Sequence, residues 1–570
     1  MLSRFIPALM WLRRYSGSEL RADGVAAVIV TLMLIPQSLA YAMLAGLPPE
    51  AGLYASILPL VGYAIFGTSR TLAVGPVAIV SLMTASAVAG MGIADPAARA
   101  AAALVLAVLV GLFLLLAGLF RLGFLANLLS HPVITGFISA SGILIGASQL
   151  GPILGIEGGG EGIVERIMRL VEGLPQTNPV TAAIGGGALA FLLWTRWGLG
   201  PLLQRMGMAA GPADLTVRAA PAAAVVVTTL LAAGLNLAET AGLNVVGRIP
   251  SGLPPLIIPE TDPELWTGLA SAALLIALVG FVESISVAQS FAAKRRETVD
   301  PDQELIGLGA ANIAAGFSGG YPVTGGFSRS AVSFAAGART PLAGVLTAVF
   351  IGLVALALTP WFYHLPRAVL SATIVAAVVP LIDLKSFRRA WGYNKADGIA
   401  EIATAVVVLF IGIEAGIATG VGLSLALYIW RTSRPHMAVV GQVPGTEHYR
   451  NIERHEVITQ PGLLAVRVDE SLYFVNARYL EDRVLGLVTE GPDVDDVVLI
   501  CSAVNFIDAS ALESLMRLND RLKDAGVRLH LTEVKGPVMD RLHDTDFLKT
   551  LTGDVFLSTH EAFESLGSQE

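Results

Sequence analysis

The sequence has a single cysteine, Cys501, among its 570 residues. One cysteine excludes an internal disulfide and any metal cluster held by several thiolates. Charged residues are also scarce, at 14% of the chain compared with about 25% in an ordinary soluble domain. The sequence contains neither a nucleotide-binding glycine loop nor a cluster of metal-ligating residues, so it gives no indication of an ATPase or another enzyme. We expect no cofactor and no metal.

Long stretches that nearly lack charge make up most of the first 430 residues. Residues 24–69 contain Glu50 as their only charged residue, and residues 100–120 contain none. The chain is 54% hydrophobic, with a mean hydropathy of +0.68. Because about 20 apolar residues span a bilayer, these stretches predict a polytopic α-helical membrane protein. We expect fourteen helical segments, near residues 24–46, 50–67, 76–90, 99–120, 132–151, 179–197, 216–236, 264–291, 303–318, 327–337, 340–360, 366–382, 396–413 and 416–432.

The charges between these segments indicate their orientation. An even number of spans returns the C-terminus to the side of the N-terminus. When that side is cytoplasmic, the inner connections carry most of the arginine and lysine, including Arg196 and Arg205. The outer connections then carry acids such as Glu50 and Asp95, with Arg99 among the exceptions. The positive-inside rule therefore predicts that both termini are cytoplasmic. The last two segments are also compatible with re-entrant helices.

Two short segments broken by glycine and proline occupy matching places in the two halves of the chain. Residues 71–78 read TLAVGPVA and residues 321–328 read YPVTGGFS, so each predicts an extended stretch before a helix start. Extended backbone at membrane depth is tolerated only inside the protein or along a cavity. A pair of such breaks points to a substrate site between inverted repeats, where half-helix N-termini present N–H groups to an anion. Two ordinary proline-kinked helices are the alternative interpretation.

The composition changes after Pro435. From residue 436 onwards there are 23 acidic and 12 basic residues, a net charge of −11 against −8 for the whole chain. Strand and helix patterns alternate, which is typical of a small α/β domain with a largely parallel sheet. We expect a membrane domain over residues 1–434 and a soluble domain over residues 435–570. Its expected strands lie near residues 463–468, 472–475, 496–501 and 527–531, and its helices near 476–489, 509–525 and up to 548.

Four short motifs stand out in the membrane part: residues 35–42 read IPQSLAYA, residues 44–49 read LAGLPP, residues 52–56 read GLYAS and residues 74–78 read VGPVA. These motifs resemble the sulfate permease (SulP) family of anion transporters. The soluble domain resembles the sulfate transporter and anti-sigma-factor antagonist (STAS) domain that ends most family members. The resemblance covers essentially the whole chain after the first twenty residues.

This resemblance implies a fold of 7+7 inverted repeats, divided into a core domain and a gate domain. The first repeat would cover about residues 20–240 and the second about residues 262–434. The resemblance also implies homodimers, assembled through the STAS and membrane domains. We expect an integral protein of a bacterial inner (plasma) membrane.

Some motifs look closest to the proton-coupled sulfate transporters of plants and bacteria. Residues 283–288 read ESISVA, residues 327–332 read FSRSAV and residues 473–477 read YFVNA. Sodium-coupled bicarbonate transporters of the family tend to have a shorter aspartate where Glu283 stands. The subfamily resemblance therefore favours sulfate and protons.

Gln37 and Tyr41 are four residues apart, so on a helix they lie on the same face, one turn apart. Pro36 removes one helical N–H bond just before them. An amide and a phenol both donate to an oxyanion without adding charge. The resemblance implies that both contact the substrate. Ordinary packing and hydrogen bonding between membrane helices is the alternative.

The start of the second half-helix combines hydrogen-bond donors with a charge. Ser328 offers a hydroxyl and a backbone N–H, and Phe327 can wall a pocket. Arg329 brings a permanent charge to membrane depth, where ionisable residues are functional candidates by default. Its planar guanidinium suits a divalent oxyanion. By resemblance, Val77 and Ala78 at the first half-helix complete the substrate site.

Glu283 follows a charge-free run inside the apolar segment near residues 264–291. Desolvation favours its neutral form, while a nearby Arg329 would favour the carboxylate. These opposed effects suit a proton carrier, so we interpret Glu283 as the proton-coupling residue. A fixed structural ion pair with Arg329 is the competing interpretation.

Taken together, these features predict a secondary active transporter that couples sulfate uptake to protons by alternating access. Bicarbonate, chloride or dicarboxylate transport by exchange or sodium coupling is the alternative. A membrane sensor whose tail recruits partners is a hypothesis from another class, and the paired half-helices argue against it. The expected partners are the anion, protons, the lipid bilayer and a second copy of the chain, but no nucleic acid.

Three further residues stand at helix starts or breaks. Ser510 lies where related bacterial antagonists carry a phosphorylatable serine, but Ala511 replaces the family glycine, and we interpret Ser510 as a helix cap. Asp383 is expected in a solvated cytoplasmic cluster of charges. Glu414 separates the last two segments, and we assign it no role.

Overall fold

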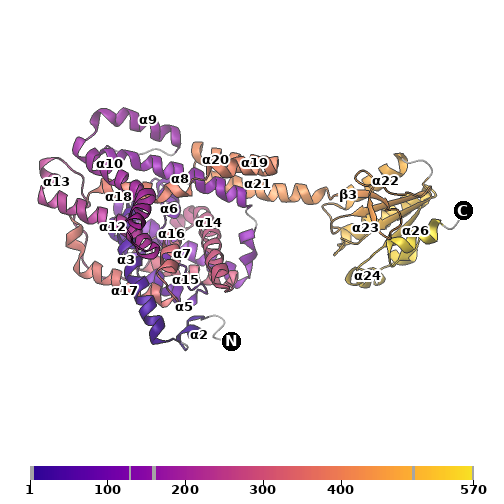
Figure 1. Cartoon of the computed structure of the whole chain (residues 1–570), viewed down its shortest axis with the longest axis horizontal. Coiled ribbons are helices and arrows are strands. Elements are labelled where there is room, and N and C mark those ends of the chain that lie inside the picture. The colour runs from indigo at the N-terminus through magenta and orange to yellow at the C-terminus, as the bar shows by residue number, and fades with distance from the viewer. Residues whose placement is uncertain (1–5, 14, 128–129, 157–161, 491–493, 568–570) are drawn as a thin grey trace. The chain divides into compact units, whose positions relative to one another are not determined.

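The computed structural model describes residues 6–13, 15–127, 130–156, 162–490 and 494–567. The chain forms two compact units, Met1–Ser424 and Leu425–Glu570. The division falls within helix α21 (Ile413–Ser433). In the described residues, the first unit consists of helices and two short strands, and the second is built on a β-sheet (Figure 1).

Helices occupy all fourteen expected segments of the first unit. By length and composition, seven helical stretches among the described residues are apolar enough to cross a membrane. The helices at the expected places are α3 (Gly17–Leu44), α4 (Pro49–Tyr54), α5 (Leu58–Phe66), α6 (Ala78–Gly90), α7 (Pro96–Leu119), α8 (His131–Leu154), α10 (Pro179–Trp194), α12 (Ala210–Gly234), α14 (Pro263–Arg295), α15 (Pro301–Phe317), α16 (Phe327–Ala335), α17 (Leu342–Ala357), α18 (Arg367–Val378), α20 (Lys395–Phe410) and α21.

Further helices lie between the apolar segments. α9 (Ile163–Gly173) and α19 (Leu384–Tyr393) mix charged with apolar residues, so a search for charge-free runs does not find them. Asp383 caps α19 by accepting hydrogen bonds from the Lys385 and Ser386 nitrogens at 3.0 and 3.1 Å, and it pairs with Arg389 at 3.4 Å. The remaining short helices are α2 (Ala8–Leu12), α11 (Gly200–Arg205) and α13 (Leu237–Thr240).

Glycines allow helices α7 and α15 to pack closely. A Cβ atom on Gly111 would lie 2.8 Å from the Ile313 nitrogen and 2.9 Å from the Gly309 oxygen. Small residues at such contacts let membrane helices approach each other. A larger residue at position 111 would therefore push the two backbones apart.

The helices of the first unit pack in two groups (Figure 1). In what we call the core group, α15 packs against α5 and α7, α14 packs against α7, and α17 packs against α3 and α5. In what we call the gate group, α8 packs against α18 and α20, and α10 packs against α8 and α18. Helix α3 also contacts α12 and α18, so the two groups meet along α3.

Two short strands precede the half-helices α6 and α16. β1 (Val74–Gly75) and β2 (Thr324–Gly325) pair antiparallel, with Val74 opposite Gly325. The sequence predicted extended backbone at both places, and the pairing connects the two halves of the first unit. Backbone hydrogen bonds between the strands satisfy groups that lipid could not.

Buried side chains hold the segments around these strands. The Asn312 amide on α15 donates to the Val323 oxygen and accepts from the Val323 nitrogen, each at 2.9 Å. The Ser330 hydroxyl on α16 accepts from the Ala73 nitrogen at 2.9 Å. On α14, the Ser284 hydroxyl accepts from the Gly325 nitrogen at 2.8 Å. The extended segments are therefore fixed from three helices.

Glu304 fixes the loop between α5 and β1. Its carboxylate is fully buried and accepts from the Tyr63 hydroxyl at 2.7 Å and from the Ser69 nitrogen at 3.0 Å. It also accepts from the Thr68 nitrogen and hydroxyl, at 2.7 and 2.6 Å. Four donors thus stabilise this one buried charge.

The second unit contains a six-stranded sheet in the order β4-β3-β5-β6-β7-β8. Strands β5 to β8 are parallel, whereas β3 pairs antiparallel with both β4 and β5. The strands are β3 (Met437–Gln442), β4 (Tyr449–Asn451), β5 (Leu463–Val468), β6 (Asp496–Ile500), β7 (Arg528–Thr532) and β8 (Val555–Phe556). The helices are α22 (Ala477–Glu490), α23 (Ala509–Asp524), α24 (Gly536–His543), α25 (Phe547–Thr550) and α26 (Thr559–Gly567).

Alternation along β6 fills both faces of this sheet. Val497 and Leu499 belong to a large core with Leu515 of α23, whereas Val498 and Ile500 pack with Phe563 of α26. All five residues of β6 are buried, as its apolar run predicted.

Two predictions for the second unit are wrong. Residues 472–475 are not a strand: Leu472 forms a single bridge to Ile507, and a turn follows. The Asn476 side chain creates this turn by accepting from the Tyr473 nitrogen at 3.0 Å. Ser510 is not the cap of α23 either, because the preceding Asp508 accepts from the Ala511 nitrogen at 2.8 Å and Ser510 is exposed.

Candidate functional site

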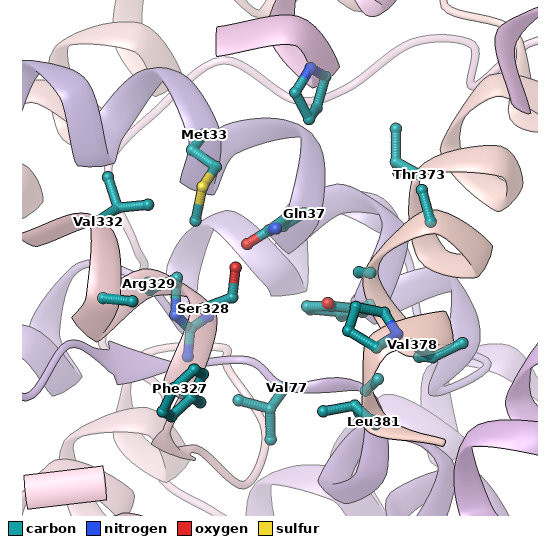
Figure 2. A pocket seen from close by; sticks show the side chains of 18 of the residues that line it. Met33, Gln37, Val77, Phe327, Ser328, Arg329, Val332, Thr373, Val378 and Leu381 are labelled. Carbon is teal, nitrogen blue, oxygen red and sulfur yellow. The ribbon is translucent and has the colours of Figure 1, made fainter. Parts of the chain in front are cut away.

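A cavity of about 550 Å³ lies between the core and gate groups beside the ends of the half-helices. On one side Ser328 and Arg329 line it, and across the space lie Thr373, Val378 and Leu381 from α18 and the turn after it (Figure 2). All eight residues that the sequence put forward line this one cavity: Gln37, Tyr41, Val77, Ala78, Glu283, Phe327, Ser328 and Arg329.

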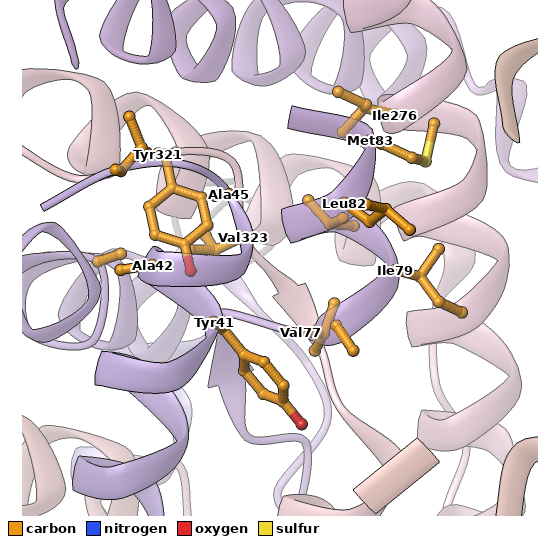
Figure 3. Close-up of a cluster of buried hydrophobic side chains, with 14 of the residues drawn as sticks. Tyr41, Ala42, Ala45, Val77, Ile79, Leu82, Met83, Ile276, Tyr321 and Val323 are labelled. Carbon is orange, nitrogen blue, oxygen red and sulfur yellow. The ribbon is translucent and has the colours of Figure 1, made fainter. Parts of the chain in front are cut away.

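Helix α3 contributes two neutral donors. Gln37 and Tyr41 are 8% and 7% exposed, one helical turn apart, and follow Pro36 inside the helix. Gln37 and Ser328 direct polar atoms into the same space (Figure 2). Tyr41 lies at the edge of an apolar cluster with its hydroxyl directed away from Tyr321 (Figure 3). Both side chains can therefore donate to an anion without adding charge.

The starts of α6 and α16 both lie on the cavity wall. Their N-cap residues, Val77 and Gly326, have extended backbone and make no side-chain capping hydrogen bond. The first N–H groups of a helix have no partner within the helix, and their dipoles favour an anion. Two uncapped helix starts on one cavity are a suitable environment for an oxyanion.

Arg329 is held by backbone carbonyl groups. Its side chain is 2% exposed, and its Nη1 donates to the Pro76 oxygen. Nη2 lies 3.4 Å from the Thr324 oxygen, and Nε is buried without a hydrogen-bond partner. Among the described residues, no carboxylate lies within 4.0 Å of it. The positive charge of Arg329 is therefore oriented but not neutralised.

Glycine makes room for this guanidinium. A Cβ atom at Gly326 would lie 3.0 Å from Arg329 Nη2, and one at Gly75 would lie 3.4 Å from Nη1. Gly75 also has a φ of +154°, which side-chain-bearing residues rarely adopt. The two glycines that mark the breaks in sequence thus border the arginine directly.

Glu283 reaches the same cavity from α14. Its Oε2 atom is buried, with no hydrogen-bond partner in the part of the chain that the structure describes. The adjacent Ser284 faces β2 instead, and its hydroxyl lies 2.6 Å from that of Thr324. The interpretation of Glu283 and Arg329 as a fixed ion pair therefore finds no support in the geometry.

Sequence reasoning did not find the wall formed by the gate group. Arg196 was counted only as a charge of an inner connection, yet it lines the cavity together with Trp197. Both belong to a π-helical segment, Thr195–Leu199, that continues α10. A π-helical turn changes the direction of the following side chains, and apolar periodicity does not reveal it. Among the described residues, no group of three or more His, Cys, Asp or Glu side chains could hold a metal.

Comparison with known proteins agrees with this arrangement. Residues 20–404 match the model of the sulfate permease family, and residues 454–562 match the STAS domain. The chain belongs to the sulfate permease family. It is 38% identical over 550 residues to "Sulfate transporter 4.1, chloroplastic" of Arabidopsis thaliana, covering 93% of this chain and 78% of that protein.

A bacterial relative and a solved structure extend the comparison. A probable sulfate transporter of Mycobacterium tuberculosis is 34% identical over 563 residues, covering 98% of this chain and 97% of that protein. The structure of SLC26A9 has the same fold, with a TM-score of 0.90 at 23% identity, covering 100% of this chain and 93% of that one. This sulfate permease family member is thus an integral membrane protein that transports anions, and not an enzyme.

Proposed function

We propose that this permease takes up sulfate together with protons. The observation that carries the proposal is the pair of opposite ionisable groups on one cavity: Arg329 is held by carbonyls, and Glu283 has a buried Oε2 without a hydrogen-bond partner among the described residues. A buried carboxylate without a partner is costly, so a proton on Glu283 is favoured when the cavity is dry. The relatives named as sulfate transporters support sulfate as the anion.

In this proposal seven of the eight residues on the core-group side of the cavity form the anion site, and the eighth, Glu283, carries the proton. The guanidinium of Arg329 supplies charge, and the starts of α6 and α16 supply N–H groups. Gln37, Tyr41 and Ser328 donate neutral hydrogen bonds, while Val77, Ala78 and Phe327 form the walls. Protonation of Glu283 removes its repulsion of the dianion, so proton and sulfate bind together.

Net uptake of a dianion needs a coupled driving force, which protons supply in this proposal. An inside-negative membrane potential opposes each negative charge by about 2.3 kcal/mol per 100 mV. Two or more protons per sulfate offset this term, and Glu283 would carry at least one of them. Release of the anion inside leaves Arg329 free to attract the carboxylate, which favours loss of the proton.

We further propose the organisation in which this transport takes place. Both termini are cytoplasmic, the chain lies in a bacterial plasma membrane, and two copies associate through the STAS and membrane domains. The membrane domain, residues 1–434, contains the inverted repeats at about 20–240 and 262–434, and residues 435–570 form the STAS domain. The core group moves against the gate group in alternating access.

One transport assay distinguishes this proposal from its alternatives. Purified protein in proteoliposomes would be given labelled sulfate or bicarbonate, with and without an inward proton gradient and with and without sodium. Sulfate uptake accelerated by external acid is the expected result. The contradicting result is uptake of bicarbonate, chloride or a dicarboxylate that depends on sodium or on a counter-anion and does not respond to acid. Exchange or sodium coupling would then be the mechanism instead of proton symport.

A further inference from the structure

A second arginine lines the cavity on the gate-group side. Arg196 lies in the π-helical segment Thr195–Leu199, and its neighbour Trp197 lines the same cavity. π-helical turns occur frequently at functional sites because they alter side-chain direction within a helix. The position of Arg196 is therefore a candidate for a role in transport.

In the part of the chain that the structure describes, no acidic side chain pairs with Arg196. Among the described residues, its hydrogen bonding consists of one long contact, 3.5 Å from Nη1 to the Ala376 oxygen, and no carboxylate lies within 4.0 Å. Unlike Arg329, which is 2% exposed, Arg196 is exposed. Its guanidinium is therefore open to a solute that enters the cavity.

Among the described residues that line the cavity, three carry acidic or basic side chains: Arg196, Glu283 and Arg329. With Glu283 protonated, the two described arginines together carry +2, equal and opposite to the charge of sulfate. With Glu283 ionised, these three side chains carry +1 in total, which leaves one charge of a dianion uncompensated by them.

Resting on the function proposed above, we propose that Arg196 forms a second, peripheral subsite for the transported oxyanion. The volume of about 550 Å³ is far larger than one tetrahedral oxyanion needs, so the anion has separate positions near Arg196 and near Arg329. The central position at Ser328 and Arg329 holds the dianion while Glu283 is protonated. Arg196 lies on the cytoplasmic side in the proposed topology, so during uptake the partly rehydrated anion passes it last, and an anion arriving from the cytoplasm meets it first.

The test uses Arg196→Gln, Arg196→Lys and a matched control, Arg205→Gln. Arg205 lies on the neighbouring helix α11, is exposed and does not line the cavity. Full-length protein would be reconstituted in one orientation, and the KM for labelled sulfate would be measured from each face of the membrane. A single charge in a cleft acts mainly on the encounter with the anion, and a compact lysine preserves that charge.

We expect Arg196→Gln to raise the sulfate KM about fivefold or more from the face to which Arg196 is open, and less than twofold from the other. Arg196→Lys should retain most of the wild-type affinity, and Arg205→Gln should resemble wild type. An unchanged KM in Arg196→Gln from both faces would overturn the subsite. So would an equal loss in Arg205→Gln, because the effect would then be one of general surface charge.

Two further measurements test the subsite even if Arg196→Gln does not fold or wild type carries no sulfate. In wild-type protein, high ionic strength should raise the KM from the Arg196 face more than from the other, because an exposed charge is screened. Equal salt dependence from both faces argues against the subsite even when Arg196→Gln does not fold. If wild type carries no sulfate, the proposed substrate fails, and the same comparison with the anion it does carry still tests Arg196.

Discussion

Two glutamates on helices α14 and α15 of the core group differ in how their buried carboxylate oxygens are hydrogen-bonded. Glu304 on α15 accepts four hydrogen bonds, from Tyr63, Thr68 and Ser69. Glu283 on α14 has a buried oxygen with no partner among the described residues, and it faces the cavity. Buried polar groups are usually hydrogen-bonded, and each exception calls for an explanation. For Glu283, our explanation is that it exchanges a proton during transport.

Asp23, near the N-terminus, is a second buried acid that is fully hydrogen-bonded in the way Glu304 is. Its buried carboxylate accepts from the Arg339 nitrogen at 2.6 Å and from the Thr340 nitrogen and hydroxyl, at 3.1 and 2.6 Å. The Tyr15 hydroxyl adds a fourth donor at 3.2 Å. Both well-satisfied acids connect distant segments, and neither lines the cavity.

The largest effect on stability should come from Glu304→Ala. The substitution leaves up to four donors without an acceptor, and each unpaired buried donor costs about 1–3 kcal/mol. We expect a loss of roughly 3–5 kcal/mol in unfolding free energy, measured by thermal or denaturant unfolding of detergent-purified protein.

Glu297→Ala is the matched control for that experiment. Glu297 pairs with Arg70 at 3.5 Å on a partly exposed surface, so its loss should cost less than about 1 kcal/mol. Equal losses in the two variants would show that the hydrogen bonds of Glu304 do not stabilise the fold. The contrast between a structural Glu304 and a proton-exchanging Glu283 would then have no basis.

Arg329→Ala should have the largest effect on binding. It removes the charge at the centre of the site, so we expect sulfate binding to become undetectable by calorimetry while the protein stays folded. Arg329→Lys should restore binding only in part, because an ammonium does not reproduce the planar fork. Arg70→Ala removes an exposed arginine and serves as control. Wild-type affinity in folded Arg329→Ala protein would exclude Arg329 from the site.

Removal of residues 435–570 should have the smallest effect on binding. None of the proposed ligands lies beyond residue 434, so a chain ending there should bind sulfate with an affinity within about twofold of wild type, although assembly and transport rate fall. Binding to the purified truncation would be measured by calorimetry. A folded truncation that binds no sulfate would make the STAS domain part of the site.

The half-helix pair and the residues around it could be predicted from the sequence because their signals are local. Glycine and proline mark the breaks, and Gln37 and Tyr41 share a face by spacing alone. The difference between Glu304 and Glu283 could not be predicted, because the partners of Glu304 lie more than 230 residues away. Arg196 was missed for a similar reason, since a π-helical segment places it on the cavity wall.

Two predictions for the second unit were also wrong, and in both cases the cause is a nearby side chain. Residues 472–475 have the composition of a strand, but the side chain of Asn476 accepts from the Tyr473 nitrogen and stabilises a turn. Serine is a common helix N-cap, but the N-cap of α23 is Asp508, two residues before Ser510. In both cases a polar side chain competes locally for the backbone.

The central claim is that Glu283 exchanges a proton during transport, unlike the structural Glu304. Glu283→Gln imitates the protonated carboxyl with almost no change in shape. Since the amide does not titrate, the variant should still bind sulfate and should unfold at nearly the same temperature as wild type.

The decisive measurement is initial sulfate uptake against external pH, at fixed sulfate concentration, in vesicles of wild type and of Glu283→Gln. The account predicts that wild-type uptake rises as the external pH falls, and that the variant binds sulfate but gains no acceleration from an inward proton gradient. A Glu283→Gln permease that keeps the full response to acid would make Glu283 a structural residue and would favour exchange or sodium coupling.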